Sequence, residues 1–237
     1  HGFVQRVFEG AAAALHRDNS RAQELHAVHV GALTLDVFCT HVDHAFQPEL
    51  RTDRRRRHAS VQVMGGQVHE VPHRAHWQPL SYNALHGGMQ RWFDPVAAAV
   101  SEQPAWQAVL RWLGSVASAA QGPQTWFTEA HQFRIDTTDG IGRPTPEGAH
   151  RDGVNWVAVF LVARQGVKGG ETRVFDVDSP RGQRFTLTEP WSLLLLDDTR
   201  VIHETTPIQP EVAGGWRDTL VVTLRSGGFL DAPAGLA

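Results

Sequence analysis

Residues 146–176 read PEGAHRDG, then VNWVAVFLVA, then RQGVKGGETRVFD. The middle run is apolar at almost every position, as is expected of a strand that is covered on both faces. Just before it, His150 and Asp152 stand two residues apart, so an extended backbone directs both side chains to one side. An imidazole and a carboxylate placed in this way supply two thirds of a metal site.

A third ligand is present further along the chain. His203 follows His150 by 53 residues, within the run LLLLDDTRVIHETTP at 193–207. Two histidines and one carboxylate on one triangular face, with the other coordination positions open, are typical of non-heme Fe(II) oxygenases. We therefore predict that His150, Asp152 and His203 bind a metal ion.

This prediction has to be separated from the general abundance of histidine, because the chain has 14 histidines. A histidine two residues before an aspartate occurs three times, at 16–18, 41–43 and 150–152. The first pair closes a predicted helix, and the second ends a predicted strand that no suitably placed third ligand follows. Only the third pair is followed in order by a strand, a Gly-Gly turn, another histidine and an arginine.

An arginine near the C-terminal end adds a second kind of chemistry. Arg217 and Thr219 alternate in a predicted strand, so they share one face while Asp218 points to the other. A guanidinium fork beside a hydroxyl can hold a carboxylate through paired, charge-assisted hydrogen bonds. The alternative is that Arg217 pairs with Asp218, or with Asp197 or Asp198, at a surface edge.

The second half of the chain is rich in short strand patterns without intervening helices. This organisation is typical of an antiparallel sandwich or barrel, and we predict a jelly roll over residues 124–230. The expected strands are 125–136, 154–163, 172–177, 183–187, 192–196, 200–206 and 216–225.

The first half, residues 1–123, reads as a helical flank with extra strands. No linker rich in Gly, Ser or Pro divides the chain, so we expect a single domain, mainly β, over residues 1–237. The irregular region within 66–94 is a candidate lid or substrate loop, although a surface connection is the simpler interpretation. The expected elements are a helix at 3–17, strands at 33–39 and 59–64 joined by an Arg-rich connection, and one or two helices within 95–120, broken near Pro104.

The composition limits the classes of partner. The chain has 237 residues, 41% of them hydrophobic, and 22 Lys and Arg against 25 Asp and Glu. A net charge near zero argues against nucleic acid or an anionic membrane as the main partner. The cluster formed by Arg51 and Arg54–Arg57 is interpreted as a solvated strand edge, or as groups paired with internal carboxylates, in preference to a nucleic-acid patch.

The single cysteine, Cys39, excludes an intramolecular disulfide and a thiolate zinc cluster, which is typical of a reducing cytoplasm. The chain contains no run of about 18 or more apolar residues, which a membrane-spanning helix would need. Arg6 and Glu9 interrupt the apolar residues at the start, where a secretion signal would lie. We expect a cytoplasmic protein; the oligomeric state is left open.

Together these motifs resemble the 2-oxoglutarate and Fe(II)-dependent dioxygenases. The matching blocks are HRD at 150–152, GGET at 169–172, HETTP at 203–207 and RDT at 217–219. The run PEGAHRDG at 146–153 is similar to the bacterial group that includes the L-isoleucine dioxygenases, which hydroxylate free amino acids. In the first half of the chain the resemblance is loose and rests on Asn83, Gly87, Gly88, Arg91 and Phe93.

The resemblance implies a cupin-like jelly roll, the double-stranded β-helix, and a hydroxylase that uses Fe(II), 2-oxoglutarate and O2. It places iron on His150, Asp152 and His203, and 2-oxoglutarate on Arg217 with help from Thr219. An intact Asp152 disfavours the chlorinating relatives, which lack that carboxylate. The expected substrate is a small molecule, in particular a free amino acid.

Two residues of the strand before the metal pair are further candidates. Gln132 and Arg134 share one face of 125–136, so either side chain could reach into the barrel. Gln132 is predicted to contribute to the co-substrate site, and Arg134 to bind a substrate carboxylate. An ion pair of Arg134 with Glu129 or Asp136, or a position facing solvent, is an equal alternative for Arg134.

Two other functions are alternatives to the dioxygenase. A cupin-type metal protein, acting as an isomerase or binding a small ligand, shares the jelly roll. Its metal set usually adds a further His or Glu, and nothing in it requires Arg217 and Thr219. A non-catalytic sensor or scaffold is disfavoured, because lost catalysis usually leaves a lost ligand.

Overall fold

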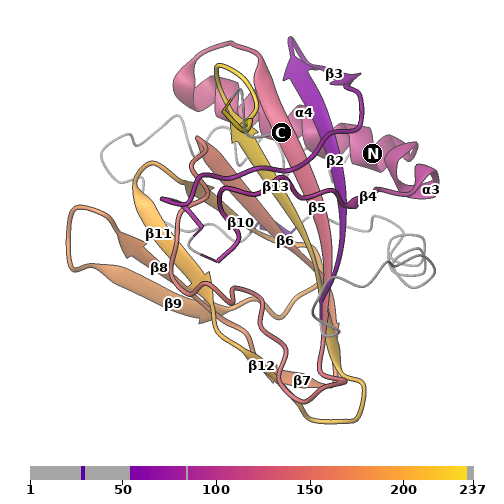
Figure 1. Ribbon diagram of the computed structural model, residues 1–237, viewed down its shortest axis with the longest axis vertical. Coiled ribbons are helices and arrows are strands. Elements are labelled where there is room, and N and C mark those ends of the chain that lie inside the picture. Colours follow the sequence, from indigo (N-terminus) through magenta and orange to yellow (C-terminus); the bar gives the residue numbers. More distant parts are fainter. Residues whose placement is uncertain (1–27, 30–53, 84, 234–237) are drawn as a thin grey trace.

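The computed structural model describes residues 28–29, 54–83 and 85–233 (Figure 1). Within these residues the chain consists mainly of antiparallel strands, and two helices precede the strand-rich half. The predicted helix at 3–17, the predicted strand at 33–39, Arg51 and Cys39 lie outside the described residues.

A large sheet forms the main layer of the molecule. Its neighbours are antiparallel, except that β4 (Asp94–Pro95) pairs in parallel with β2. In spatial order the strands are β1 (Val28–His29), β10 (Ser192–Asp197), β6 (Trp156–Gln165), β13 (Trp216–Arg225), β5 (Trp126–Asp136), β2 (Arg54–Met64) and β3 (Gln67–Glu70).

Two smaller sheets complete the strand arrangement. The three-stranded sheet has the order β11 (Val201–Thr205), β8 (Glu171–Asp176) and β9 (Gly182–Thr186). The two-stranded sheet pairs β12 (Ile208–Pro210) with β7 (Val167–Gly169). Side chains of β8 and β9 pack in one apolar cluster with side chains of β6 and β10. The large and small sheets therefore face each other, which confirms the predicted jelly roll.

The other face of the large sheet is covered by α4 (Pro104–Gln121), which follows the short α3 (Ala98–Ser101). The apolar residues of α4 recur at helical spacing and pack against β2, β5, β6 and β13. Gly114 permits close contact, since a Cβ at this position would lie 2.4 Å from the Val63 side chain. Pro104 occupies the first turn of α4, where its missing N–H costs no helical hydrogen bond.

Strand β6 shows why residues 154–163 are apolar throughout. Ala158 and Phe160 belong to the cluster under α4, whereas Val157 and Leu161 belong to the cluster between the two sheets. The strand is thus covered on both faces, as predicted.

Each of the other strands expected in the second half of the chain is present, and its ends lie within about two residues of the expected ones. The main difference lies in the first half, where Arg54–Arg57 were expected to form a connection. They are the first residues of β2, which pairs with β5, so this segment belongs to the main sheet. No helix in the described residues is long and apolar enough to cross a membrane.

Candidate active site

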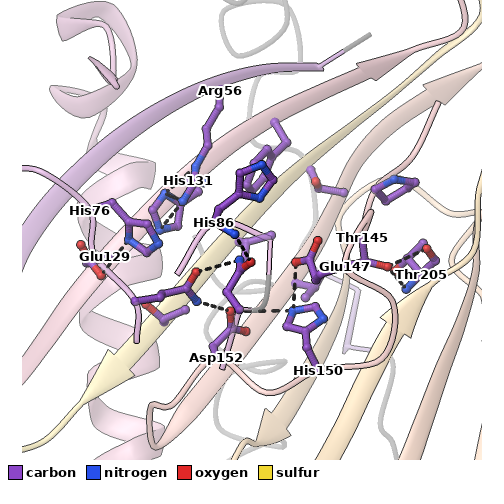
Figure 2. A pocket seen from close by; sticks show the side chains of 18 of the residues that line it. Arg56, His76, His86, Glu129, His131, Thr145, Glu147, His150, Asp152 and Thr205 are labelled. Carbon is purple, nitrogen blue, oxygen red and sulfur yellow. Dashed lines mark hydrogen bonds and ion pairs between the residues drawn. The ribbon is translucent and has the colours of Figure 1, made fainter. Parts of the chain in front are cut away.

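The inner face of the large sheet lines a pocket, together with residues of β11 and of the segment 76–91 (Figure 2). Strand alternation selects the lining side chains. Odd-numbered residues of β5 and β13 face the pocket, and even-numbered residues of both strands face α4. The lining includes Glu129, His131, Phe133 and Ile135 of β5, Arg217, Thr219, Val221 and Thr223 of β13, and Arg54 and Arg56 of β2.

The predicted metal ligands come together at this pocket. His150 and His203 are joined by an isolated antiparallel bridge, with backbone N–H to O distances of 3.0 and 2.9 Å. This pairing places the two imidazole rings 4.7 Å apart, between centroids. The two oxygens of Asp152 lie 3.9 Å from His150 Nε2 and 3.7 Å from His203 Nε2. The three groups could hold a metal ion.

The protonation of these groups differs. Burial lowers the pKa of His203 to about 4, so this imidazole is neutral at pH 7 and able to bind a metal. Burial acts in the same direction on His150, but the charges of Asp152 and Glu147 outweigh it and raise the pKa of His150. Glu147 Oε1 lies 3.6 Å from His150 Nε2.

A buried carboxylate holds the loop that carries Asp152. Asp198 is fully buried and accepts the backbone N–H groups of Asp152, Gly153 and Val154 at 2.8 to 3.1 Å. Arg151 donates to the backbone carbonyl of Asp198 at 2.6 Å. Asp198 therefore orients the turn from which Asp152 projects.

Gln78 holds the Asp152 side chain itself. Its amide nitrogen donates to Asp152 Oδ1 at 3.1 Å, and its carbonyl oxygen accepts from Asn83 at 3.2 Å and from Arg91 at 3.1 Å. Asn83 Oδ1 in turn accepts the backbone N–H of His86 at 2.8 Å. The segment that the sequence marked as a possible lid thus contacts the predicted metal carboxylate.

We expect Gln78→Leu to weaken Fe(II) binding by about 10- to 100-fold, the usual cost of losing a group that orients a metal ligand. The substitution keeps a similar volume but removes the donor to Asp152. Equilibrium titration with Fe(II) under anaerobic conditions measures the change. Gln103→Leu, at the start of α4, is the control and should bind iron normally. Equal affinities for both variants would exclude the orienting role.

Arg217 and Thr219 lie where the alternation of β13 predicts, on the pocket face. Arg217 is only 3% exposed, and its Nε has no hydrogen-bond partner in the described part of the chain. Burial, with a contribution from Arg164, lowers the pKa of Arg217 to about 10, so it remains charged at neutral pH. A buried guanidinium to which the described residues offer no carboxylate partner fits an anionic ligand. Asp218 points to the opposite face, as expected.

The structure places Gln132 and Arg134 differently from the prediction. They do share one face of β5, but it is the face toward α4, and neither lines the pocket. Arg134 donates to both oxygens of Asp218, at 2.8 and 2.7 Å, so an ion pair replaces the expected substrate contact. Gln132 is buried away from Arg217, and its co-substrate role is likewise not supported.

Several pocket residues were not identified from the sequence. Arg54 and Arg56 belong to the cluster that was interpreted as a strand edge, yet both line the pocket. Arg56 is buried and stacks on the Phe93 ring at 4.0 Å. Arg54–Arg57 are four consecutive arginines, so the residue pattern alone does not indicate which of them face the pocket. Strand alternation selects Arg54 and Arg56, but it applies only because the segment belongs to β2.

A second group of polar side chains is buried at the same wall. It comprises His58, His76, Glu129 and His131. Burial lowers the pKa values of the three histidines, that of His76 to about 4. Burial alone would raise the pKa of Glu129, but hydrogen bonds from His58 and His76 hold it below its ordinary value. The group therefore contains neutral imidazoles and an ionised carboxylate at pH 7.

We expect acid to destabilise the metal-free protein between pH 6.5 and 4. His76 has its ordinary pKa of 6.5 in the unfolded protein and a pKa of about 4 in the folded protein. Between these pH values the unfolded protein therefore binds a proton at His76 that the folded protein does not bind. The stabilisation is complete above pH 6.5 and falls by about 3 kcal/mol for His76 as the pH reaches 4. Urea unfolding in the presence of a chelator measures it. His76→Gln should reduce this pH dependence, whereas His69→Gln, at an exposed position, should not.

Comparisons with known proteins support one family. A family model described as 2OG-Fe dioxygenase matches residues 41–223. The crystal structure of a bsmA homolog from Methylobium petroleophilum PM1 is 50% identical, with a TM-score of 0.77, and the match covers 84% of this chain and 83% of that chain. No protein with a curated description matches the chain.

Two more distant structures share the fold. IDO from Bacillus thuringiensis is 16% identical, with a TM-score of 0.70, and the match covers 93% of this chain and 96% of that chain. TqaL, described as an Fe(II)/(alpha)ketoglutarate-dependent dioxygenase, is 19% identical, with a TM-score of 0.69 and coverage of 93% and 90%. At such identities the likeness concerns the fold alone.

Proposed function

Because the chain belongs to the 2OG-Fe dioxygenase family, whose model matches residues 41–223, we propose that it hydroxylates a free amino acid. As a member of this family it is a dioxygenase that uses Fe(II), 2-oxoglutarate and O2. Family membership decides against the cupin-type alternative considered from the sequence.

The proposed iron ligands are His150, Asp152 and His203. The observation that carries this assignment is the convergence of two imidazole nitrogens on the two oxygens of one carboxylate, at 3.9 and 3.7 Å. Such a set leaves coordination positions open for 2-oxoglutarate and O2. When bound, the iron supplies the oxidising chemistry. The protein orients Asp152 through Asp198 and Gln78.

Arg217 is the proposed anchor for the distal carboxylate of 2-oxoglutarate, and Thr219 adds a hydroxyl. Both side chains line the same pocket as the three proposed iron ligands. Gly170 of the Gly-Gly turn lies beside this side chain, since a Cβ built on Gly170 would be 3.9 Å from Arg217 Nε. A buried arginine offers a planar fork that matches a carboxylate.

Two observations support an amino acid as the substrate. The run at 146–153 resembles that of the L-isoleucine dioxygenase group. The pocket also carries groups of both signs, as a zwitterion requires: Arg54 and Arg56 on β2, and Glu147 beside His150. Glu147 Oε2 is buried, and the described residues offer it no hydrogen-bond donor, so it could accept a substrate ammonium group.

The test is a screen of free amino acids and other small acids for succinate release that depends on the added compound. A true substrate should gain the mass of one oxygen atom. Glu147→Gln should raise the KM for an amino acid more than it lowers kcat, since the lost contact is to the substrate ammonium group. The contrary result is that the enzyme converts 2-oxoglutarate to succinate reproducibly, but none of these compounds increases the rate or gains oxygen. This result would contradict the amino acid proposal and favour a peptide or protein substrate.

A further inference from the structure

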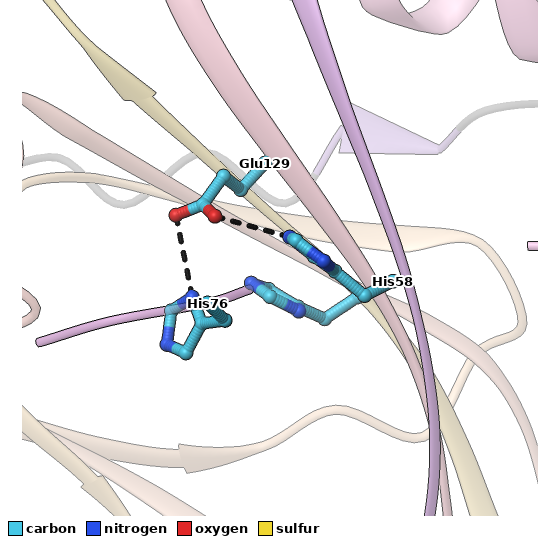
Figure 3. A group of neighbouring side chains, drawn as sticks. His58, His76 and Glu129 are labelled. Carbon is cyan, nitrogen blue, oxygen red and sulfur yellow. Dashed lines mark hydrogen bonds and ion pairs between the residues drawn. The ribbon is translucent and has the colours of Figure 1, made fainter. Parts of the chain in front are cut away.

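His58, His76 and Glu129 form a second set of two imidazoles and one carboxylate (Figure 3), and His76 and Glu129 line the same pocket as the proposed iron ligands. His58 Nε2 is 3.0 Å from Glu129 Oε1, and His76 Nδ1 is 3.3 Å from Glu129 Oε2. The donor types are the same as in the proposed iron site, but the residues are different. None of the three side chains is more than 7% exposed.

Three separate parts of the chain supply this set. His58 lies on β2 and Glu129 on the neighbouring β5, where Ser60 is opposite Glu129 and His131 is opposite His58. The two side chains are therefore diagonal neighbours on one face of the sheet. His76 comes from the segment 76–91, where an isolated bridge to Arg91 fixes its backbone.

The spacing of the donor atoms matches that around a bound ion. Two ligands at about 2.0–2.2 Å from a metal, at angles between octahedral and tetrahedral, are about 2.8–3.6 Å apart. Both distances to Glu129, 3.0 and 3.3 Å, lie in this range.

His131 belongs to the group but is not suited to be a ligand. Its ring is stacked on His58 at 4.7 Å with an interplanar angle of 11°, so the in-plane lone pairs of the two rings run parallel and do not converge. Arg56 also donates to its Nδ1, at 3.2 Å from Nε. This contact leaves the proton of the neutral ring on Nε2, where a ligand would need a lone pair.

We propose that His58, His76 and Glu129 bind a divalent first-row transition metal ion. Imidazole and carboxylate together suit Zn(II), Fe(II) and Ni(II), whereas Ca(II) and Mg(II) prefer oxygen ligands. Ser60 Oγ lies 3.3 Å from His58 Nε2 and so places a hydroxyl beside the set. His76 and Gln78 lie on the same short segment, so a metal bound at His76 would also fix the segment that orients Asp152.

The experiment uses the full chain with the proposed iron site removed by the double substitution His150→Ala and Asp152→Ala. This background is titrated with Co(II), whose visible absorption reports an ordered site, and the bound metal is counted by elemental analysis. We expect one Co(II) per chain. Adding Glu129→Gln should weaken binding more than about 100-fold, since even groups outside the ligand shell cost 10- to 100-fold. Adding His69→Ala, which removes an exposed histidine, should change nothing.

Circular dichroism and the melting temperature establish that each variant is folded. If the Glu129 variant does not fold, His76→Gln in the same background takes its place. A folded background protein that binds no Co(II), or that binds it equally with and without Glu129, would overturn the proposal. This result is independent of the proposed iron site, because that site is absent from every variant in the titration.

Discussion

Replacing Asp152 with alanine is expected to abolish turnover and to weaken Fe(II) binding at the proposed iron site by more than about 100-fold. Asp152 is the only carboxylate of the proposed iron site, and both of its oxygens face an imidazole nitrogen. Loss of a group that only orients a ligand already costs 10- to 100-fold, so loss of the ligand should cost more. Fe(II) with 2-oxoglutarate, added without oxygen, should give a weak visible charge-transfer band with the unsubstituted protein and none with Asp152→Ala.

The matched control is Asp178→Ala, which removes an exposed aspartate from the loop after β8. It should retain both the band and turnover. If Asp152→Ala retained the band at the same Fe(II) concentration, the iron would have to be bound elsewhere. The assignment of all three ligands would then fail, since His150 and His203 were grouped by their distances to Asp152.

Arg217→Ala is expected to reduce the affinity for 2-oxoglutarate by about ten-fold to several hundred-fold. A charge-assisted hydrogen bond from a buried arginine is worth about 1.5–3 kcal/mol, and a bidentate one more. Fe(II) binding should remain nearly normal, because Arg217 is not among the groups that could hold the metal. Titration of the charge-transfer band with 2-oxoglutarate measures the effect directly.

Related substitutions separate the anchor from a structural role. Arg217→Lys should recover little affinity, since an ammonium group cannot reproduce the guanidinium fork. Thr219→Ala should cost less, about 1 kcal/mol, as the loss of one neutral donor. Arg173→Ala, on the surface, is the control. Normal 2-oxoglutarate binding by Arg217→Ala, accompanied by loss of iron or of the fold, would make Arg217 a structural residue.

The strands of the second half could be predicted because each carries its own pattern. Residues 154–163 are apolar at alternate positions of both kinds, so both faces of this strand are apolar. In the structure, β6 is packed against other side chains on both faces. The grouping of His150 with Asp152 and His203 could also be predicted, because two of the residues are neighbours and the order of the following motifs is distinctive. These features depend on local spacing, which the sequence displays directly.

Strand β5 shows where local spacing is insufficient. Alternation correctly placed Gln132 and Arg134 on one face, but both faces of this strand are buried. A pattern with two buried faces does not indicate which one meets the pocket. The assignment depends on the position of α4, which packs against Trp126 and Ala130 and so leaves the odd-numbered residues to the pocket.

The amino-acid sequence by itself thus determined the strand-rich fold, the chemistry of the donor groups, and the relation of Arg217 to Asp218 on opposite faces of one strand. Only the tertiary structure decided which distant groups meet. It brought Gln78 to Asp152, Asp218 to Arg134, and His76 to Glu129. The reason is physical: the period of a strand is a property of a few consecutive residues, whereas these contacts depend on how sheets, helix and loop pack against one another.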